Sequence, residues 1–235
     1  MPALYRVLVK GLVTRGRLLA MGGLGLVGIL LAVLVRTSSQ VDRHDVAYNL
    51  VDGYGLSILV PVVALVFASA ALGDPSEDGT LVYLWLRPVP RWQLAVAAAA
   101  AALTVSIPLA VVPVVLGAVI AGVGGSFVVG ALCASGLAAV AYTAVFCGLG
   151  LRVRRALAWG LAYLLIWEQA VARIAKGAAR LSISVTTRTI DARLAHHDPL
   201  PRNAMSMVVA VAVPLALTAL AIGFTARSLD RGEIT

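Results

Sequence analysis

Charged residues are scarce in this sequence. Only 13% of its 235 residues are Asp, Glu, Lys or Arg, whereas 60% are hydrophobic and the mean hydropathy is +0.95. A water-soluble domain of this length cannot bury so much apolar surface, but a lipid bilayer solvates it. The composition therefore excludes an ordinary soluble domain and predicts a membrane protein.

Cysteine and histidine are also rare. Cys133 and Cys147 are the two cysteines, and fourteen residues of one helix place them about 21 Å apart, too far for a disulfide. The histidines are His44, His196 and His197, all in predicted outer loops, and one adjacent pair is a weak metal signal. We predict no catalytic, cofactor-binding or metal-binding residues in this chain, and no enzyme activity.

Two motifs that would change this interpretation are missing. The stretch from Gly11 to Gly16 lacks the Lys-Ser/Thr pair and the preceding strand of a phosphate-binding P-loop. The first apolar run nearly spans a membrane, and Arg36 follows it without a small-residue cleavage pattern. We therefore expect an anchor rather than a signal peptide, and no ATP hydrolysis by this chain.

Long apolar runs dominate what is present. A run of about 20 apolar residues crosses the hydrocarbon core as a helix, because every backbone group must be satisfied internally. The sequence predicts an all-α polytopic protein with a single transmembrane domain over residues 1–235. The six predicted spans are Leu18–Val35, Leu56–Gly73, Leu94–Ala121, Val128–Leu151, Leu157–Val171 and Met205–Ala226.

The net charge of +8 points to anionic lipid headgroups, not nucleic acid, because the basic residues flank the spans. The positive-inside rule places both termini in the cytoplasm of a plasma-membrane protein. The residues on that side are Arg6, Lys10, Arg15, Arg17, Arg87, Arg91, Arg152, Arg154, Arg155, Arg227 and Arg231. One outer loop opposes this orientation, with Arg173, Lys176, Arg180, Arg188, Arg193 and Arg202.

The first seventeen residues predict an interfacial amphipathic helix. Its polar stripe consists of Arg6, Lys10, Thr14 and Arg17, spaced so that they share one helix face. A basic flank that only fixes the topology is an equally good interpretation.

Two spans carry features of helix packing. Pro108 and Pro113 each remove a backbone donor, so the third span should kink or tilt. In the fourth span, small residues at four-residue spacing permit close helix contact, first with a neighbouring helix of this chain and second with another subunit. They are Ala131, Ser135, Ala139 and Thr143.

The fifth apolar run has about fifteen residues, roughly 22 Å of helix, and is shorter than the hydrocarbon thickness. Residues 172–204 follow as a predicted outer segment, either re-entrant or amphipathic. Glu168 is the one ionisable residue that the sequence places inside a span, and such residues are functional candidates. Two interpretations are equally open for it. One is a role in subunit contact or in the substrate pathway, and the other is a simple position at the membrane interface.

The loop 74–92 is the most informative segment. Asp74-Pro75 is typical of a helix start, with the acid as cap and the proline at the first position. Leu81, Leu84 and Trp85 then share one face, which would fit a groove on a soluble partner. The alternative is that the aromatic and basic side chains only anchor the loop at the membrane surface.

The pattern from Glu77-Asp78-Gly79-Thr80-Leu81 to Arg87-Pro88-Val89-Pro90-Arg91-Trp92 resembles the coupling loop of ABC-2 type ABC transporter permeases. YLLIWE at 163–168 and LSIS at 181–184 resemble that family's fifth span and the following segment. The alanine run at 97–102 departs from it, because members often carry a lysine there.

The resemblance implies a non-catalytic exporter permease that pairs with a second permease chain, mainly through the first and fifth spans. Two cytoplasmic ATPase subunits, which bind ATP and Mg, would dock on the coupling helix. The implied coupling residues are Glu77, Asp78, Gly79, Thr80, Leu81, Leu84, Trp85, Arg87 and Arg91, and Glu168 would lie near the pathway or the subunit contact. The alternatives are a gradient-driven secondary transporter and a non-transporting scaffold, and the substrate is open.

Overall fold

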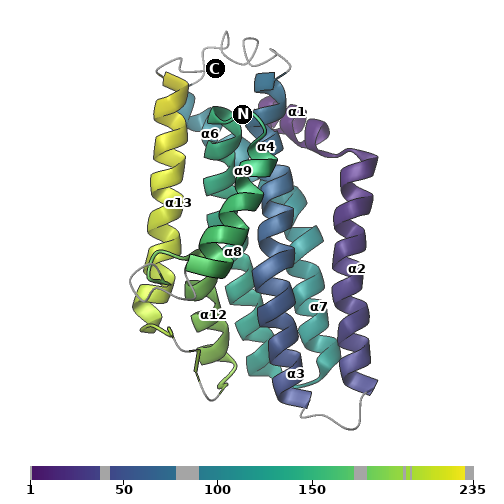
Figure 1. Cartoon of the computed structure of the whole chain (residues 1–235). Helices are drawn as coiled ribbons and strands as arrows, with labels where there is room; N and C mark the ends of the chain where they lie inside the picture. The colour runs from purple at the N-terminus through teal and green to yellow at the C-terminus, as the bar shows by residue number, and fades with distance from the viewer. Residues whose placement is uncertain are drawn as a thin grey trace.

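The computed structural model is a bundle of helices (Figure 1). It describes residues 2–37, 43–77, 90–171, 179–197, 200–201 and 203–230, and these contain no strand. The elements are α1 (Pro2–Leu12), α2 (Arg15–Thr37), α3 (Arg43–Asn49), η1 (Leu50–Leu59), α4 (Val60–Glu77), α6 (Arg91–Ser106), η2 (Ile107–Val111), α7 (Val112–Ala121), α8 (Gly125–Arg152), α9 (Ala156–Ala162), η3 (Tyr163–Val171), α12 (Ile183–Leu194) and α13 (Met207–Asp230).

Five helical stretches of the described chain are long and apolar enough to cross a membrane, and the all-α prediction is confirmed. The predicted fifth span, Leu157–Val171, is helical but divided into α9 and η3, of seven and nine residues. Together they are about 24 Å long, less than the hydrocarbon thickness. Six full spans are therefore not confirmed. The five stretches are Arg15–Thr37, Arg43–Pro75, Arg91–Ala121, Gly125–Arg152 and Met207–Leu229.

The second span is much longer than its predicted range, Leu56–Gly73. Its helix begins at Arg43 and continues through η1 and α4 to Glu77. Asp74 and Pro75, predicted to begin a separate helix, lie in the last turn of α4, so that prediction is wrong. Residues 78–89, which would hold the coupling helix, lie outside the described chain.

The predicted interfacial helix of residues 1–17 is also divided. α1 ends at Leu12, and α2 begins at Arg15 in a new direction (Figure 1). α1 buries Leu8 and Leu12 and packs against α6 and α4. Because the helix ends there, Arg17 belongs to the first membrane helix and not to the polar stripe of α1.

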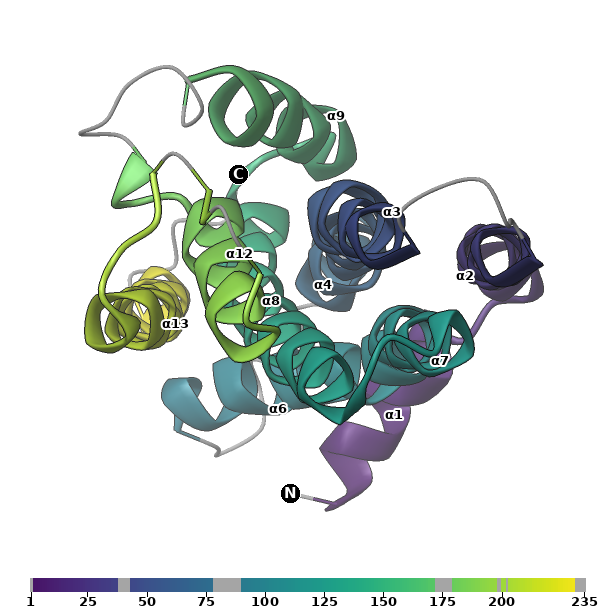
Figure 2. The ribbon, with the colours of Figure 1, turned by 90° about the horizontal axis from the view of Figure 1, so that it is seen from below.

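α8 lies at the centre of the bundle, in contact with α4, α12, α13, α6 and α7 (Figure 2). Its predicted small-residue stripe is buried, with Ala131, Ser135 and Thr143 all at 0% exposure. The first predicted partner of that stripe, a neighbouring helix of the same chain, is confirmed. Glycine allows α8 to approach α4 closely: a Cβ on Gly150 would lie 2.2 Å from the carbonyl oxygen of Ser69 on α4.

The third membrane helix changes its geometry near a proline, as predicted. α6 and α7 are joined by the π-helical stretch η2, which contains Pro108. A proline has no N–H to donate, and a wide turn accommodates the break in the hydrogen-bond ladder. Above the break in Figure 1, α6 packs against α13, and below it α7 packs against α2.

α1 and the C-terminal end of α13 lie at the same end of the bundle (Figure 1). The α4 terminus at Glu77, the α6 start at Arg91 and the α8–α9 turn at Arg154 belong to this end as well. At the opposite end, Nη1 of Arg36 donates to the carbonyl oxygen of Ile120 at 2.9 Å and joins α2 to α7. We call these the terminal end and the opposite end.

Candidate functional site

The structure describes only some of the predicted coupling residues. Glu77 is the last residue of α4 and Arg91 the first residue of α6, and these two helices pack against each other. The loop between them therefore connects two neighbouring helix ends at the terminal end. Asp78, Gly79, Thr80, Leu81, Leu84, Trp85 and Arg87 lie outside the described residues, and their role stays a prediction.

An ion pair fixes the start of the loop to the first membrane helix. Nη1 of Arg17 lies 2.8 Å from Oδ2 of Asp74, and Nη2 lies 3.3 Å from Oδ1. Both side chains are partly exposed, so the pair contributes little to stability. Its bidentate geometry does align the beginning of α2 with the end of α4.

Glu168 lies in the interior of the chain, with 1% of its surface exposed. Its Oε1 accepts hydrogen bonds from the hydroxyl of Tyr163 at 3.0 Å and from the N–H of Ile183 at 3.3 Å. Its Oε2 accepts from Oγ of Ser182 at 2.5 Å and from the N–H of Ser184 at 3.1 Å. Four donors of one chain thus surround this carboxylate.

The reason for this arrangement is the start of α12. The first N–H groups of a helix have no partner within the helix, and its N-terminus favours negative charge. Glu168 supplies that charge from η3, while Oγ of the N-cap Ser182 accepts from the N–H of Val185 at 3.1 Å. The carboxylate therefore joins η3 to the start of α12. Its predicted role in a pathway or subunit contact stays a prediction.

α12 is buried from Ile183 to Ala192 except at Arg188, which is half-buried. A helix on the membrane surface would leave one face exposed, and α12 has no such face within the described chain. The re-entrant or amphipathic character of residues 172–204 stays a prediction. The hydroxyls of Thr186, Thr187 and Thr189 donate to backbone carbonyl oxygens one turn earlier. These bonds satisfy three of the buried hydroxyls of α12. Within the described chain, Oγ of Ser184 and the carboxylate of Asp191 have no hydrogen-bond partner.

Sequence reasoning missed a second group of buried charges. Arg188 of α12 donates from Nε and Nη2 to both carboxylate oxygens of Asp52 on η1. Asp191, at 0% exposure, lies nearby with neither carboxylate oxygen hydrogen-bonded within the described chain. Glu168 is thus not the only ionisable residue inside the bundle. The missed signal was the acid at Asp52, four residues before the apolar run that begins at Leu56.

This ion pair involves one of the six basic residues that opposed the predicted orientation. Arg188 is neutralised by Asp52 inside the bundle, so it does not act as a free positive charge on the outer side. Arg193 donates from Nε to the carbonyl oxygen of Met205 at 2.9 Å. Arg173, Lys176 and Arg202 lie outside the described residues.

One group at the opposite end has the composition of a metal site. His44 and Asp45 begin α3, and the ring of His197 stacks on the ring of Tyr48 at 3.8 Å between centroids. One ligand atom from each of His44, Asp45 and His197 lies within 4.8 Å of the others. Ligands of tetrahedral zinc lie about 3.3 Å apart, so these side chains would have to move closer together to hold an ion.

Comparison with known families gives one match. The model of a family described as ABC-2 family transporter protein matches residues 14–167. This range includes the first four membrane helices, the loop 74–92, α9, and η3 as far as Trp167. No curated protein matches the chain.

Proposed function

Because the chain belongs to the ABC-2 family of transporter proteins, we propose that it is the permease subunit of an ATP-driven exporter. The observation that carries the proposal is the family match over residues 14–167, together with five helices able to cross a membrane. The hydrolysis of ATP, with Mg, would take place in two separate cytoplasmic ATPase subunits. The terminal end would then face the cytoplasm of a plasma-membrane protein.

In this proposal the ATPases act through the loop between α4 and α6. Support comes from the position of its two ends, Glu77 and Arg91, on helices that pack against each other. A force on the loop would reach α4 directly and α2 through the Arg17–Asp74 pair. α4 packs against the central helix α8, and α2 packs against α7, so the force would be passed to both helices.

We further propose that two permease chains pair through α2 and the α9–η3 crossing. Both present large apolar side chains on the surface of the isolated chain. On α2, Leu26 and Leu30 are 60% and 62% exposed, and on η3, Leu165 and Ile166 are 58% and 62% exposed. Lipid could cover the same faces, because lipid tails are as apolar as leucine.

The proposal is tested by purifying the tagged chain in mild detergent and identifying the proteins that accompany it. A stoichiometric ATPase with a phosphate-binding P-loop is expected. The substitutions Arg91→Glu and Trp85→Ala should abolish its association, while membrane insertion stays normal. Unchanged association in both variants would contradict the coupling-loop assignment.

Pairing is tested separately with single cysteines at Leu26 and Leu30. An interface through α2 predicts disulfide-linked dimers in membranes, after Cys133 and Cys147 have been replaced by serine. Val208, which is 78% exposed on α13, is the matched control and should not cross-link. Equal cross-linking at Val208 would indicate random collision instead of an interface.

A gradient-driven carrier is the second candidate, because a specific observation favours it. Such carriers use ionisable residues inside the membrane, and Asp52, Arg188 and Asp191 form a buried group of that kind. Transport in sealed vesicles separates the two mechanisms. Transport that requires ATP and continues in the presence of an uncoupler supports the exporter. Transport that occurs without ATP and stops when an uncoupler is added supports the carrier.

A further inference from the structure

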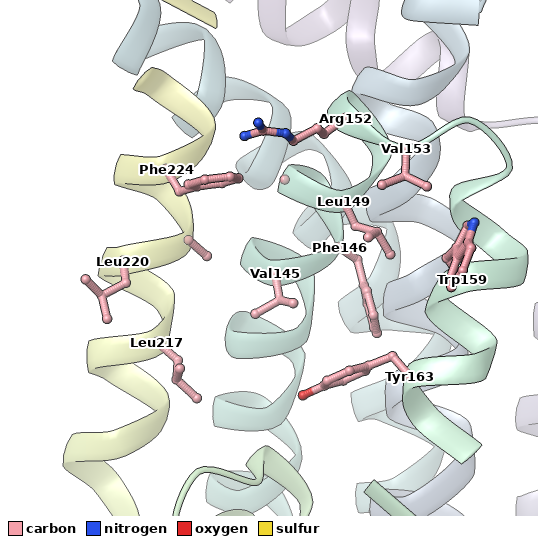
Figure 3. A pocket seen from close by; sticks show the side chains of 12 residues that line it. Val145, Phe146, Leu149, Arg152, Val153, Trp159, Tyr163, Leu217, Leu220 and Phe224 are labelled. Carbon is pink, nitrogen blue, oxygen red and sulfur yellow. The ribbon is translucent and has the colours of Figure 1, made fainter. Parts of the chain in front are cut away.

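A groove of about 860 Å³ lies between α8, α9 and α13 (Figure 3). This is within the range of about 300–1,000 Å³ in which proteins hold small ligands. Its walls are formed mainly by apolar and aromatic side chains from three helices. Phe146 and Leu149 come from α8, Trp159 and Tyr163 from the α9–η3 crossing, and Leu220 and Phe224 from α13.

The groove has one charged residue among those that line it. Arg152, at the end of α8, extends across the top of the gap toward α13 (Figure 3). Its guanidinium carbon lies 5.3 Å from the ring centroid of Phe224, a cation–π contact that orients the charge at the mouth. This mouth is at the terminal end, where headgroups of one lipid leaflet would lie.

The groove is open at its sides in the isolated chain. Leu220, Trp159 and Phe224 line it and remain 69%, 64% and 51% exposed. On α13 the lining residues recur at spacings of three and four, so one face of this helix is devoted to the groove. An occupant can therefore enter from the hydrocarbon region without any helix moving apart.

Charge and polarity together decide which occupant fits. An acyl chain gains little by leaving the bilayer for an apolar wall, because both surroundings are equally apolar. Selectivity must therefore come from Arg152, whose guanidinium forms strong, bidentate hydrogen bonds with phosphate. A long apolar body with one anionic phosphate at its end matches both parts of the groove.

We propose that this groove is a binding site for a single phospholipid with an anionic headgroup. The phosphate would bind Arg152, and the acyl chains would lie along Val145, Leu149 and Leu220 as far as the ring of Tyr163. The hydroxyl of Tyr163 donates to Glu168, so the lipid would pack on the residue that orients the cap of α12. This inference does not depend on ATPase coupling or on pairing of two chains.

The test uses native mass spectrometry of the full chain. Protein purified in detergent is stripped of lipid and then incubated with phosphatidylglycerol or phosphatidylcholine. Wild type should retain one phosphatidylglycerol per chain and bind it about tenfold more tightly than phosphatidylcholine. Equal affinity for the two lipids would overturn the proposal.

Two pairs of variants locate the site. Arg152→Gln should lose the preference for phosphatidylglycerol, whereas Arg154→Gln, in the connection between α8 and α9 and outside the groove, should keep it. Leu220→Trp should narrow the groove and reduce the amount of bound lipid, whereas Val208→Trp, exposed on the same helix, should not. A loss of lipid in both members of a pair would overturn the assignment, because it would show a general membrane effect.

A measurement on the wild type does not depend on whether the variants fold. Phosphatidylglycerol with a photoreactive group in its acyl chain should label α8 and α13 near Val145 and Leu220. Labelling confined to other helices would contradict the proposal. A dimer that excludes lipid from wild type, and that Leu220→Trp converts to monomer, would instead assign the groove to a second copy of the chain.

Discussion

The helices α2 and α4 are almost equally apolar but occupy opposite environments. In the most apolar 18-residue window of Arg15–Thr37 the mean hydropathy is 2.6 and 17% of the residues are buried. In that of Arg43–Pro75, which contains α3, η1 and most of α4, the mean hydropathy is 2.4 and 83% of the residues are buried. Hydrophobicity places both in the membrane but does not separate a helix that faces lipid or another chain from one in the core. The core is distinguished by close glycine contacts, such as that of Gly150 with Ser69, and by the hydrogen bonds of Glu168 and the ion pair of Asp52.

The largest expected effect is at Glu168, in the core. Glu168→Ala removes the acceptor of four buried donors, and each unsatisfied buried donor costs about 1–3 kcal/mol. We expect a large drop in the unfolding temperature in detergent, with loss of α12 packing. Tyr163→Phe removes only one donor and should cost about 1 kcal/mol. Similar melting temperatures for the two variants would show that the cap is not the origin of the effect.

The next effect is at the buried ion pair. Arg188→Ala leaves the carboxylate of Asp52 buried without its partner, which costs about 3–5 kcal/mol. The double variant Asp52→Asn with Arg188→Met removes both charges and should recover most of that loss, because neutral replacements of buried pairs are often tolerated. Thermal unfolding of Asp52→Asn, Arg188→Met and the double variant measures this. Additive losses in the double variant would contradict a direct pair.

A smaller effect is expected at the contact between α4 and α8. Gly150→Ala places a Cβ 2.2 Å from the carbonyl oxygen of Ser69, and overpacking of this kind costs about 1–3 kcal/mol. On the same helix, a Cβ on Gly136 meets nothing within 4 Å. Gly136→Ala should therefore leave the unfolding temperature unchanged or raise it. Equal losses at both positions would show that α8 tolerates no substitution in general.

The smallest effect on the stability of the single chain is expected on α2. Leu30 is 62% exposed, so Leu30→Ala removes few contacts within the chain and should change the unfolding free energy by no more than about 0.5 kcal/mol. If α2 forms a subunit interface, the fraction of dimer should fall instead. Detergent unfolding and cross-linking of the same sample separate these effects. A large loss of monomer stability would show that α2, like α4, is packed into the core of the single chain.

The sequence predicted the membrane helices well where an uninterrupted apolar run stood alone. The predicted fourth span, Val128–Leu151, corresponds to α8 within three residues at either end. It failed at the second span, because the chain before Leu56 carries Asp45 and Asp52 and looks like a loop. In the structure the acid of Asp52 is paired with Arg188, 136 residues away in sequence. No local pattern reveals such a partner.

The candidate site was predicted in the same uneven way. Glu168 was selected because an acid inside an apolar run is costly without a purpose. Its partners could not be predicted, since Ser182 and Ser184 belong to a segment whose charges favoured the outer surface. The end of α1 at Leu12 was missed as well, because the spacing of Arg6, Lys10, Thr14 and Arg17 continues the helical pattern across the break.

By itself, the sequence determined that this chain is an all-helical membrane protein, because apolar runs of this length have no other stable solvent than a bilayer. Its loop motif also determined the family resemblance. Only the tertiary structure decided which helix is central, which charges neutralise each other and where a groove remains open. These properties arise from contacts between residues far apart in the chain, and hydropathy carries no information about them.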